Sequence, residues 1–396
     1  MVSIALTGGG TGGHIYPGLA VASALKAAFP CRLFWIGSNS GMDRKIVEDA
    51  GMEFFGIPSG KLRRYFSLRN ISDVFKIARG FFAARRVLKR ERPSLLFSKG
   101  GFVSVPPCAA AKTLGIPVFT HESDYSPGLA TRINSALVER IFIPYKESAA
   151  FYKPAEKVSV SGNPIRTAFA GADAAKGRAF LGLSDGERVL LVLGGSSGSL
   201  EVNALVRAAL SELTKRYTVV HQTGENPDEI NKSLSLNSTT NSEPAVRHEP
   251  LRTNEECQSD SSWLNNLGNK YKPYAYFRDE IPHVIAAAEL VLCRSGAGTI
   301  WECKSLGKPM VLIPLRGSGT RGDQVENARL FGEAGAAICF IPDEAVTIAA
   351  GKLSALVATL ADDPERRRAM GEAKIGKPDA AAFIAKEIIN RISEVK

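Results

Sequence analysis

With 396 residues, 44% of them hydrophobic and 23% charged, the chain has the composition of a globular protein and the length for two domains, each with its own core. No apolar run approaches the roughly 18 residues of a membrane-spanning helix, and the first residues indicate a strand and a glycine turn, not a secretion signal. We therefore expect a cytoplasmic protein. Its formal charge of +10 is uneven, because residues 1–163 hold 22 Lys and Arg against 11 Asp and Glu.

Cysteine spacing bears on metal and redox chemistry. None of the six cysteines forms a Cys-x-x-Cys pair, which argues against a zinc cluster and against a secreted disulfide framework. We expect reduced, mostly buried thiols and no metal site. The cysteines are Cys31, Cys108, Cys257, Cys293, Cys303 and Cys339.

Short apolar runs alternate with helical patterns along the chain, which is typical of a doubly wound parallel sheet. After the Gly-Asn-Pro breakers near residue 163 the pattern restarts, so we predict two similar α/β domains, 1–163 and 164–396. The polar stretch 225–272 indicates a long excursion outside the second core. Predicted strands of the first domain are 2–7, 32–36, 95–98, 117–121 and 158–160, with helices that include 42–50 and 105–114.

The first glycine turn lies between the first strand and the first helix. Its Gly8, Gly10 and Gly13 satisfy G-x-G-x-x-G, a pattern whose backbone N–H groups and helix dipole can cradle a phosphate. A nicotinamide site is not favoured, because the second strand ends in Gly-Ser-Asn without the acidic residue that binds ribose. The alternative is that the glycines only let strand and helix pack closely.

His14 follows this turn, in the predicted first turn of the helix. A helix N-terminus disfavours the imidazolium form, so a neutral ring could accept a proton from a substrate near pH 7. The alternative interpretation is a histidine that merely satisfies the helix end.

The second domain repeats the arrangement with "GGSSGS" at 194–199, where Ser196 and Ser197 put hydroxyls beside free N–H groups. The pattern could also be a serine-capped helix start. Further on, Glu302 follows a Gly-Ala-Gly turn and could accept two hydrogen bonds from a ribose. The Gln324 amide, which both donates and accepts, suits the hydroxyls of a sugar.

Several stretches together resemble the MurG family. They are "TGGGTGGHIYPGLAVA", "GGFVSVPPCAAAKTLGIPVFTHESDYSPGLATRI", "GNPIR", "LGGSSGS", "HQTG" and "CRSGAGTIWECKSLGKPMVLIPL" with "GDQVENARLFGEAGAA". The family consists of UDP-N-acetylglucosamine:undecaprenyl-diphospho-muramoylpentapeptide N-acetylglucosaminyltransferases of peptidoglycan synthesis. The resemblance covers nearly the whole chain in the right order.

The resemblance implies a GT-B fold, two Rossmann-like domains facing across a cleft, with the last helix packing back on the first domain. It implies inverting transfer of N-acetylglucosamine from UDP-N-acetylglucosamine to the muramic C4 hydroxyl of lipid I, which gives lipid II. It identifies His14 as the residue beside the reaction centre. Residues that match donor-binding motifs are Thr11, Gly12, Gly13, Arg166, Ser196, Gly296, Ala297, Gly298, Thr299, Glu302 and Gln324.

The chain departs from the family pattern at Asp124. The family often has His-Glu-Gln-Asn where this chain has "HESD", so a carboxylate that can only accept replaces an amide. Asp124 therefore competes with His14 for the role of general base. Arg166, Ser196 and the helix N-termini would stabilise the leaving diphosphate, and because no Asp-x-Asp follows the second glycine turn we expect no metal cofactor.

Two other functions remain open, a UDP-N-acetylglucosamine 2-epimerase and a non-catalytic UDP-sugar-binding protein. The epimerase would need no basic amphipathic surface such as residues 61–92, where eleven basic and two acidic residues are interleaved with aromatic ones. We expect this segment to dock on the anionic cytoplasmic face of the membrane, where lipid I is met, and not on nucleic acid. The alternative is a helix packed on one face and solvated on the other. The docking residues are expected to be Arg63, Arg64, Phe75, Phe81, Phe82, Arg85 and Arg86, with Ile77 and Leu88 beside them.

Overall fold

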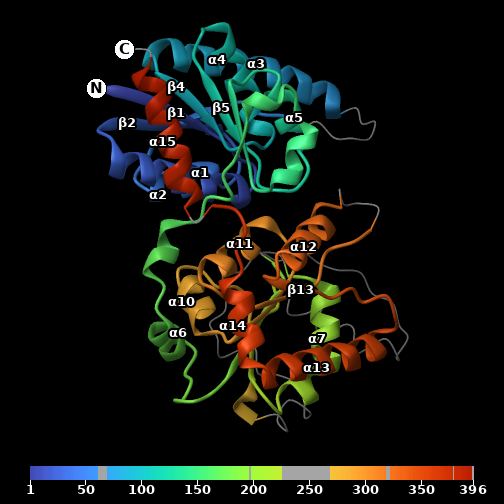
Figure 1. The fold of residues 1–396 in the computed structure, drawn as a ribbon. Helices are drawn as coiled ribbons and strands as arrows, with labels where there is room; N and C mark the ends of the chain where they lie inside the picture. The colour runs from blue at the N-terminus through green and yellow to red at the C-terminus, as the bar shows by residue number, and fades with distance from the viewer. Residues whose placement is uncertain (61–68, 196–197, 225–267, 318–321, 378, 395–396) are drawn as a thin grey trace, which may run out of the picture. The chain divides into compact units, whose positions relative to one another are not determined.

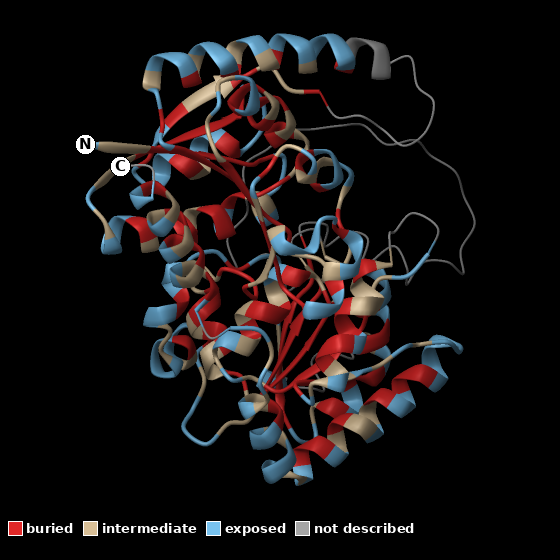
Figure 2. Ribbon diagram, turned by 45° about the horizontal axis from the view of Figure 1, so that its top comes forward, coloured by how far each residue is buried: buried red, intermediate tan, exposed pale blue. Residues whose placement is uncertain are grey.

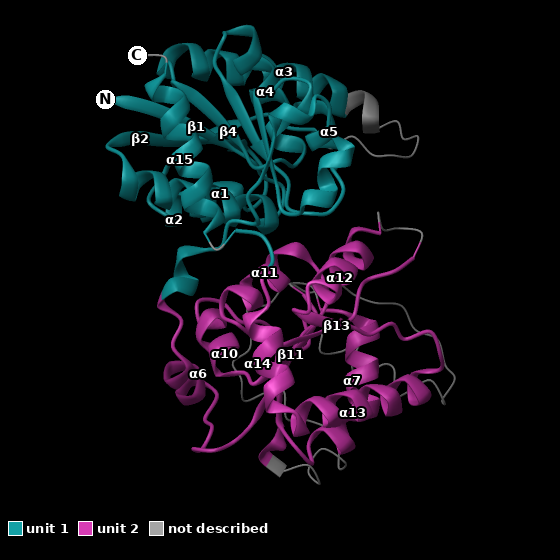
Figure 3. Cartoon of the chain, in the orientation of Figure 1, with its two compact units in different colours: residues 1–170, 375–396 teal, residues 171–374 magenta. Residues whose placement is uncertain are grey.

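The computed structural model describes residues 1–60, 69–195, 198–224, 268–317, 322–377 and 379–394. The chain forms two compact units, one of residues 1–170 with 375–396 and one of residues 171–374 (Figure 3). The division between the units thus falls at 170–171, whereas the sequence analysis places it at 163–164. The last helix, α15 (Ala380–Ser393), belongs to the first unit and lies against α1 (Gly12–Ala28) (Figure 1).

The first unit is built on a seven-stranded parallel sheet with the order β3-β2-β1-β4-β5-β6-β7. Its first strand is central: Ile4 pairs with Leu33 on one side and with Leu95 on the other. The strands are β1 (Val2–Thr7), β2 (Cys31–Ser38), β3 (Glu53–Ile57), β4 (Leu95–Ser98), β5 (Val118–His121), β6 (Arg140–Ile143) and β7 (Val158–Val160). The helices besides α1 and α15 are α2 (Asp43–Asp49), α3 (Arg69–Glu91), α4 (Val105–Thr113) and α5 (Leu129–Ser135).

Two apolar clusters, on opposite faces of this sheet, form the core of the first unit. α15 enters one of them through Ile384 and Ile388, which are fully buried with Leu25 and Phe142. Burying each such side chain stabilises the fold by about 1.5–3 kcal/mol. This burial explains why a helix from the end of the chain completes a unit that the sequence begins.

The second unit has a six-stranded parallel sheet with the order β10-β9-β8-β11-β12-β13. The strands are β8 (Val189–Leu193), β9 (Thr218–Gln222), β10 (Tyr271–Tyr274), β11 (Leu290–Cys293), β12 (Met310–Leu312) and β13 (Ala337–Cys339). The helices are α6 (Ala174–Phe180), α7 (Leu200–Leu213), α10 (Ile281–Ala287), α11 (Ala297–Ser305), α12 (Asp323–Glu333), α13 (Val346–Asp362) and α14 (Pro364–Glu372).

The predicted strands and helices of the first domain are present, with ends that differ by a few residues. The polar excursion is different: residues 225–267 lie outside the described residues, but Tyr271–Tyr274 is an edge strand that pairs with β9. Its mixed burial explains why the sequence pattern missed it. The five described cysteines are free thiols, of which Cys108, Cys293 and Cys303 are buried.

From residue 73 onward, helix α3 presents its outer face to solvent (Figure 2). Phe75 and Phe82, seven residues apart and so on one side of the helix, are 69% and 67% exposed. Phe81 is half-buried against the core and Leu88 is fully buried. These two side chains therefore pack inward, whereas the sequence analysis places them on the docking surface. In the part of the chain that is described, no helix is both long and apolar enough to cross a membrane.

Candidate active site

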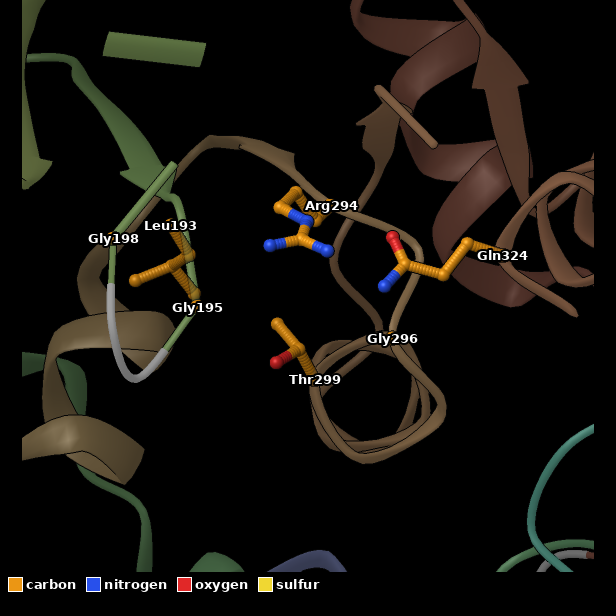
Figure 4. Close-up of a pocket in the computed structure, with 7 residues that line it drawn as sticks. All are labelled: Leu193, Gly195, Gly198, Arg294, Gly296, Thr299 and Gln324. Atoms are coloured by element: carbon orange, nitrogen blue, oxygen red, sulfur yellow. The ribbon is translucent and has the colours of Figure 1, made fainter. Parts of the chain in front are cut away.

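The second unit contains a pocket of about 180 Å³ at the carboxyl ends of β8 and β11 (Figure 4). Three helices begin around it: Gly198 precedes α7, Gly296 is the N-cap of α11, and Gln324 is in the first turn of α12. Free N–H groups and the positive ends of helix dipoles favour an anion at such a place. The lining residues are Leu193, Gly195, Gly198, Arg294, Gly296, Thr299 and Gln324.

The backbone of the turn between β8 and α7 requires glycine. Gly195 and Gly198 have φ of +97° and +75°, and a Cβ on Gly198 would lie 2.3 Å from the Thr223 carbonyl oxygen. The Gln222 side chain donates a hydrogen bond to the Gly195 carbonyl at 2.9 Å, which holds the turn open toward the pocket. Ser196 lies outside the described residues, between the two glycines that line the pocket.

Arg294 is a pocket residue that the sequence analysis did not identify. Figure 4 shows its guanidinium directed into the pocket, opposite the Thr299 hydroxyl and the Gln324 amide. Burial lowers the pKa of this half-buried arginine, with the Glu201 carboxylate acting against the shift, and its Nε has no hydrogen-bond partner among the described residues. A cation directly before the Ser-Gly-Ala-Gly turn was the available sequence signal.

The predicted residues of the α11 and α12 region are close together. Gly296 and Thr299 line the pocket, Ala297 is buried behind it, and Gly298 is exposed. Half-buried Glu302 is three residues after Thr299, on the same side of α11. These residues form a site that could hold an anion together with neighbouring hydroxyl groups.

Gln324 is held in place by its own unit. Its Oε1 accepts a hydrogen bond from the Leu315 N–H at 3.0 Å, and its carbonyl accepts one from the Ser295 hydroxyl at 2.6 Å. Asn327 donates to the Ser295 carbonyl at 3.1 Å. Because Oε1 is occupied, the Gln324 NH₂ group is the part of the amide that remains to contact a ligand.

In the first unit, three strands end beside one another and each leads into a candidate residue. β1 leads into the turn with Thr11, Gly12, Gly13 and His14; β4 leads into Lys99; and β5 ends at His121, followed by Glu122 and Asp124. His14, Lys99, His121, Glu122 and Asp124 are called here the strand-end cluster. The carboxyl ends of parallel strands are where ligands bind in open α/β sheets.

Glu122, which the sequence analysis did not single out, organises the loop that carries Asp124. Its carboxylate accepts hydrogen bonds from the N–H groups of Ser123, Asp124 and Gly128, at 2.9, 3.3 and 3.1 Å. Burial alone would raise the pKa of Glu122, but the Lys99 ammonium and hydrogen bonds from Thr131 and Gly128 lower it overall. The loop is therefore held around a buried carboxylate.

His14 lies half-buried in the first turn of α1, and its N–H donates to the Thr11 carbonyl at 3.0 Å. A second glycine turn closes on its ring: a Cβ on Gly101, where φ is +77°, would come within 2.9 Å of the ring carbon Cδ2. Only glycine can therefore occupy that position without moving the imidazole.

Arg166 belongs to the first unit. Its guanidinium stacks over the rings of Tyr16 and Phe169, each centroid 5.0 Å away. Tyr16 is on α1, two residues after His14, so Arg166 brings a positive charge to the same helix end.

Arg63 and Arg64, predicted on the docking surface, lie outside the described residues. No group of three metal-ligating side chains occurs in the ranges that the structure describes.

Two open parallel sheets, one of them with a pocket lined by helix N-termini, are the architecture of GT-B glycosyltransferases. The glycosyltransferase family 28 N-terminal domain matches residues 4–143, and the family's C-terminal domain matches residues 189–392. A UDP-N-acetylglucosamine--N-acetylmuramyl-(pentapeptide) pyrophosphoryl-undecaprenol N-acetylglucosamine transferase of Treponema denticola is 45% identical over 348 residues, covering 85% of this chain and 83% of its own. The chain belongs to glycosyltransferase family 28, and within it to the MurG enzymes.

Another relative bears the same name, and two solved structures share the fold. A protein of the same name from Clostridium botulinum strain Langeland is 37% identical over 346 residues, 87% of each chain. The structure of MurG from Acinetobacter baumannii has a TM-score of 0.70 at 22% identity and covers 98% of this chain and all of its own. The structure of UDP-GlcNAc 2-epimerase from Neisseria meningitidis has a TM-score of 0.69 at 16% identity, a likeness of fold alone, and covers both chains fully.

Proposed function

We propose that this enzyme transfers N-acetylglucosamine from UDP-N-acetylglucosamine to the C4 hydroxyl of the muramic acid of lipid I, with inversion at the anomeric carbon. The observation that carries the donor side is the pocket where three helix N-termini meet Arg294. A diphosphate is the part of the donor that needs these groups, because negative charge grows on it as the glycosidic bond breaks.

The remaining donor contacts follow from chemistry. The Glu302 carboxylate is suited to the paired hydroxyls of the ribose, and the Gln324 NH₂ group to a hydroxyl of the transferred sugar. The segment 296–299 is proposed to border the uracil ring of the donor. Ser196 is proposed to contact the diphosphate. Arg166, a residue of the first unit, is also proposed to bind the diphosphate, because it matches the family motif for that role.

The proposal for the acceptor side is based on the strand-end cluster. The attacking hydroxyl must lose a proton, and His14 is proposed as the base, with Asp124 as the alternative. Thr11, the N-cap of α1, and Gly12 and Gly13 in its first turn present N–H groups next to His14, where they can bind oxygen atoms of either sugar substrate.

Transfer of radiolabel tests the proposal. Purified enzyme with labelled UDP-N-acetylglucosamine and a short-chain lipid I analogue is expected to give a labelled disaccharide lipid and free UDP. Conversion of the donor to its 2-epimer without acceptor would instead support the epimerase function, and tight donor binding without turnover would support a sensor. Either result would overturn the proposed transfer.

Gln324 gives a prediction about donor selectivity. Gln324→Ala is expected to weaken UDP-N-acetylglucosamine by about 3- to 10-fold, the value of one neutral hydrogen bond, and to leave UDP binding nearly unchanged. Glu302→Ala, as the matched comparison, is expected to weaken both ligands alike, because the ribose is common to them. Calorimetry with the two ligands measures this. Equal losses in Gln324→Ala would mean that the amide does not contact the sugar.

We also propose that α3 docks the first unit on the anionic cytoplasmic face of the cell membrane. Phe75 and Phe82 project from the helix beside the exposed Arg79, Arg85 and Arg86. Exposed aromatic rings between cations are the arrangement that lies in a lipid interface, and each cation near such a surface contributes about 1 kcal/mol.

Charge reversal tests the docking surface. The variant Arg85→Glu, Arg86→Glu, Phe82→Ser is expected to lose sedimentation with phosphatidylglycerol vesicles while UDP binding is unchanged. Salt should release the wild type, because this attraction is screened within about 10 Å at 0.1 M. Arg366→Glu with Arg368→Glu, on exposed positions of α14, is the matched control and should still sediment. Sedimentation of the α3 variant at low salt would rule out this helix as the docking surface.

A further inference from the structure

Lys99 is a lysine that the fold buries almost completely. It follows β4, its N–H donates to the Thr7 carbonyl at 2.8 Å, and its side chain is 1% exposed. Its Nζ has no hydrogen-bond partner among the described residues. A buried ammonium without a hydrogen bond is costly unless nearby charge compensates it, so its presence calls for an explanation.

Two other lysines of this chain show the ordinary solution. Lys308, half-buried, donates to the carbonyls of Ala286 and Ala288 at 2.6 and 2.8 Å, and Lys304 donates to the carbonyl of Gly371. Backbone oxygens therefore anchor the ammonium where a lysine serves packing alone. Lys99 lacks such an anchor, which indicates that its charge serves another purpose.

The charges that face Lys99 come from the neighbouring elements of the strand-end cluster. Burial lowers the pKa of Lys99, and the carboxylates of Glu122 and Asp124, after β5, act against that shift and favour the charged ammonium. Burial and the Lys99 ammonium lower the pKa of His121, so its ring is neutral. The Nε2 of His121 forms a hydrogen bond with the Gly162 carbonyl oxygen at 3.0 Å. From α1, His14 interacts with Glu122, and the Gly100–Gly101 turn that follows Lys99 closes on the His14 ring.

We propose that Lys99 is a positioning residue of the acceptor side: its buried ammonium balances the charge of Glu122 and Asp124, and so keeps the His14 imidazole neutral and able to accept the acceptor's proton. The inference rests on the proposed function, in which His14 is the base. Without the ammonium, the negative charge of the neighbouring carboxylates would act more strongly on His14, and opposite charge favours the protonated ring. A protonated ring cannot accept a proton.

Lys99→Met tests the proposal, because methionine fills a similar volume without the charge. The His14 titration, followed by NMR of ring-labelled histidine and assigned with His14→Gln, is expected to move to higher pH. The acid limb of kcat against pH should move with it, so that activity lost at pH 7 returns at higher pH. Loss of packing alone would lower kcat at every pH and leave the titration in place.

The reciprocal variant keeps the proposal testable if Lys99→Met does not fold. Glu122→Gln removes the opposite charge and is expected to move the His14 titration down, while Lys112→Met, an exposed lysine on α4, should not move it. An unchanged His14 titration in folded Lys99→Met, or in Glu122→Gln, would overturn the proposal. The NMR measurement needs no acceptor, so it decides the role of Lys99 even if wild-type enzyme fails to glycosylate lipid I.

Discussion

Replacing His14 by alanine is expected to lower kcat for transfer to a lipid I analogue by roughly 10²- to 10⁴-fold, the contribution of a positioned general base. The dissociation constant of UDP should stay within about twofold of the wild type, because the base acts in the transition state and the donor pocket is in the other unit. Steady-state kinetics and calorimetry on the same preparations measure both quantities.

Asp124→Asn is the companion variant for this prediction. It keeps the side-chain shape and leaves the Glu122 carboxylate to hold the loop. If His14 is the base, Asp124→Asn should retain far more turnover than His14→Ala. Full turnover in His14→Ala with a large loss in Asp124→Asn would transfer the role of base to Asp124.

Arg294→Met is expected to weaken both UDP and UDP-N-acetylglucosamine by roughly 10- to 100-fold. A hydrogen bond to a charged group contributes about 1.5–3 kcal/mol, and Arg294 is the pocket side chain that can pair with a diphosphate. Arg294→Lys should recover only part of the affinity, because it keeps the charge without the planar fork. Calorimetry measures these losses directly.

Arg329 on α12 provides the matched control for Arg294. It is exposed and pairs with Glu326 and Glu333 on its own helix at 2.9 and 2.5 Å. Such pairs contribute little to stability in water, so Arg329→Met should change neither ligand affinity nor the fold appreciably. Undiminished UDP affinity in Arg294→Met would mean that the diphosphate is bound elsewhere.

The strands that the sequence pattern predicts are those with strong apolar runs bounded by breakers, such as β1 and β4. β3 and β6, which the pattern did not separate, have partly buried or charged positions: Glu53 is exposed at the start of β3, and half-buried Arg140 begins β6. An exposed or charged residue interrupts the continuous apolar run by which a buried strand is predicted.

The residues of the candidate site also divide into those that the local sequence identifies and those that only the fold identifies. Glycine turns after strands are local features, so Gly13, His14 and Gly296 could be identified from sequence. Arg294 and Glu122 could not, because their significance depends on partners distant in sequence, such as Gln324 for the former and Lys99 for the latter. From sequence alone, a lysine that follows a strand is expected to be exposed. Only the folded structure shows that neighbouring strands bury it.

The sequence by itself determined the α/β class, the two repeats of strand and glycine turn, the family and the positions of the candidate base and pocket turns, since each depends on residues close together in the chain. Only the tertiary structure decided that α15 completes the first core, that Phe81 and Leu88 pack inward while Phe75 and Phe82 face solvent, and that Arg294 lines the pocket. These outcomes depend on burial by distant segments, and burial sets both which apolar face is covered and which charge must find a partner.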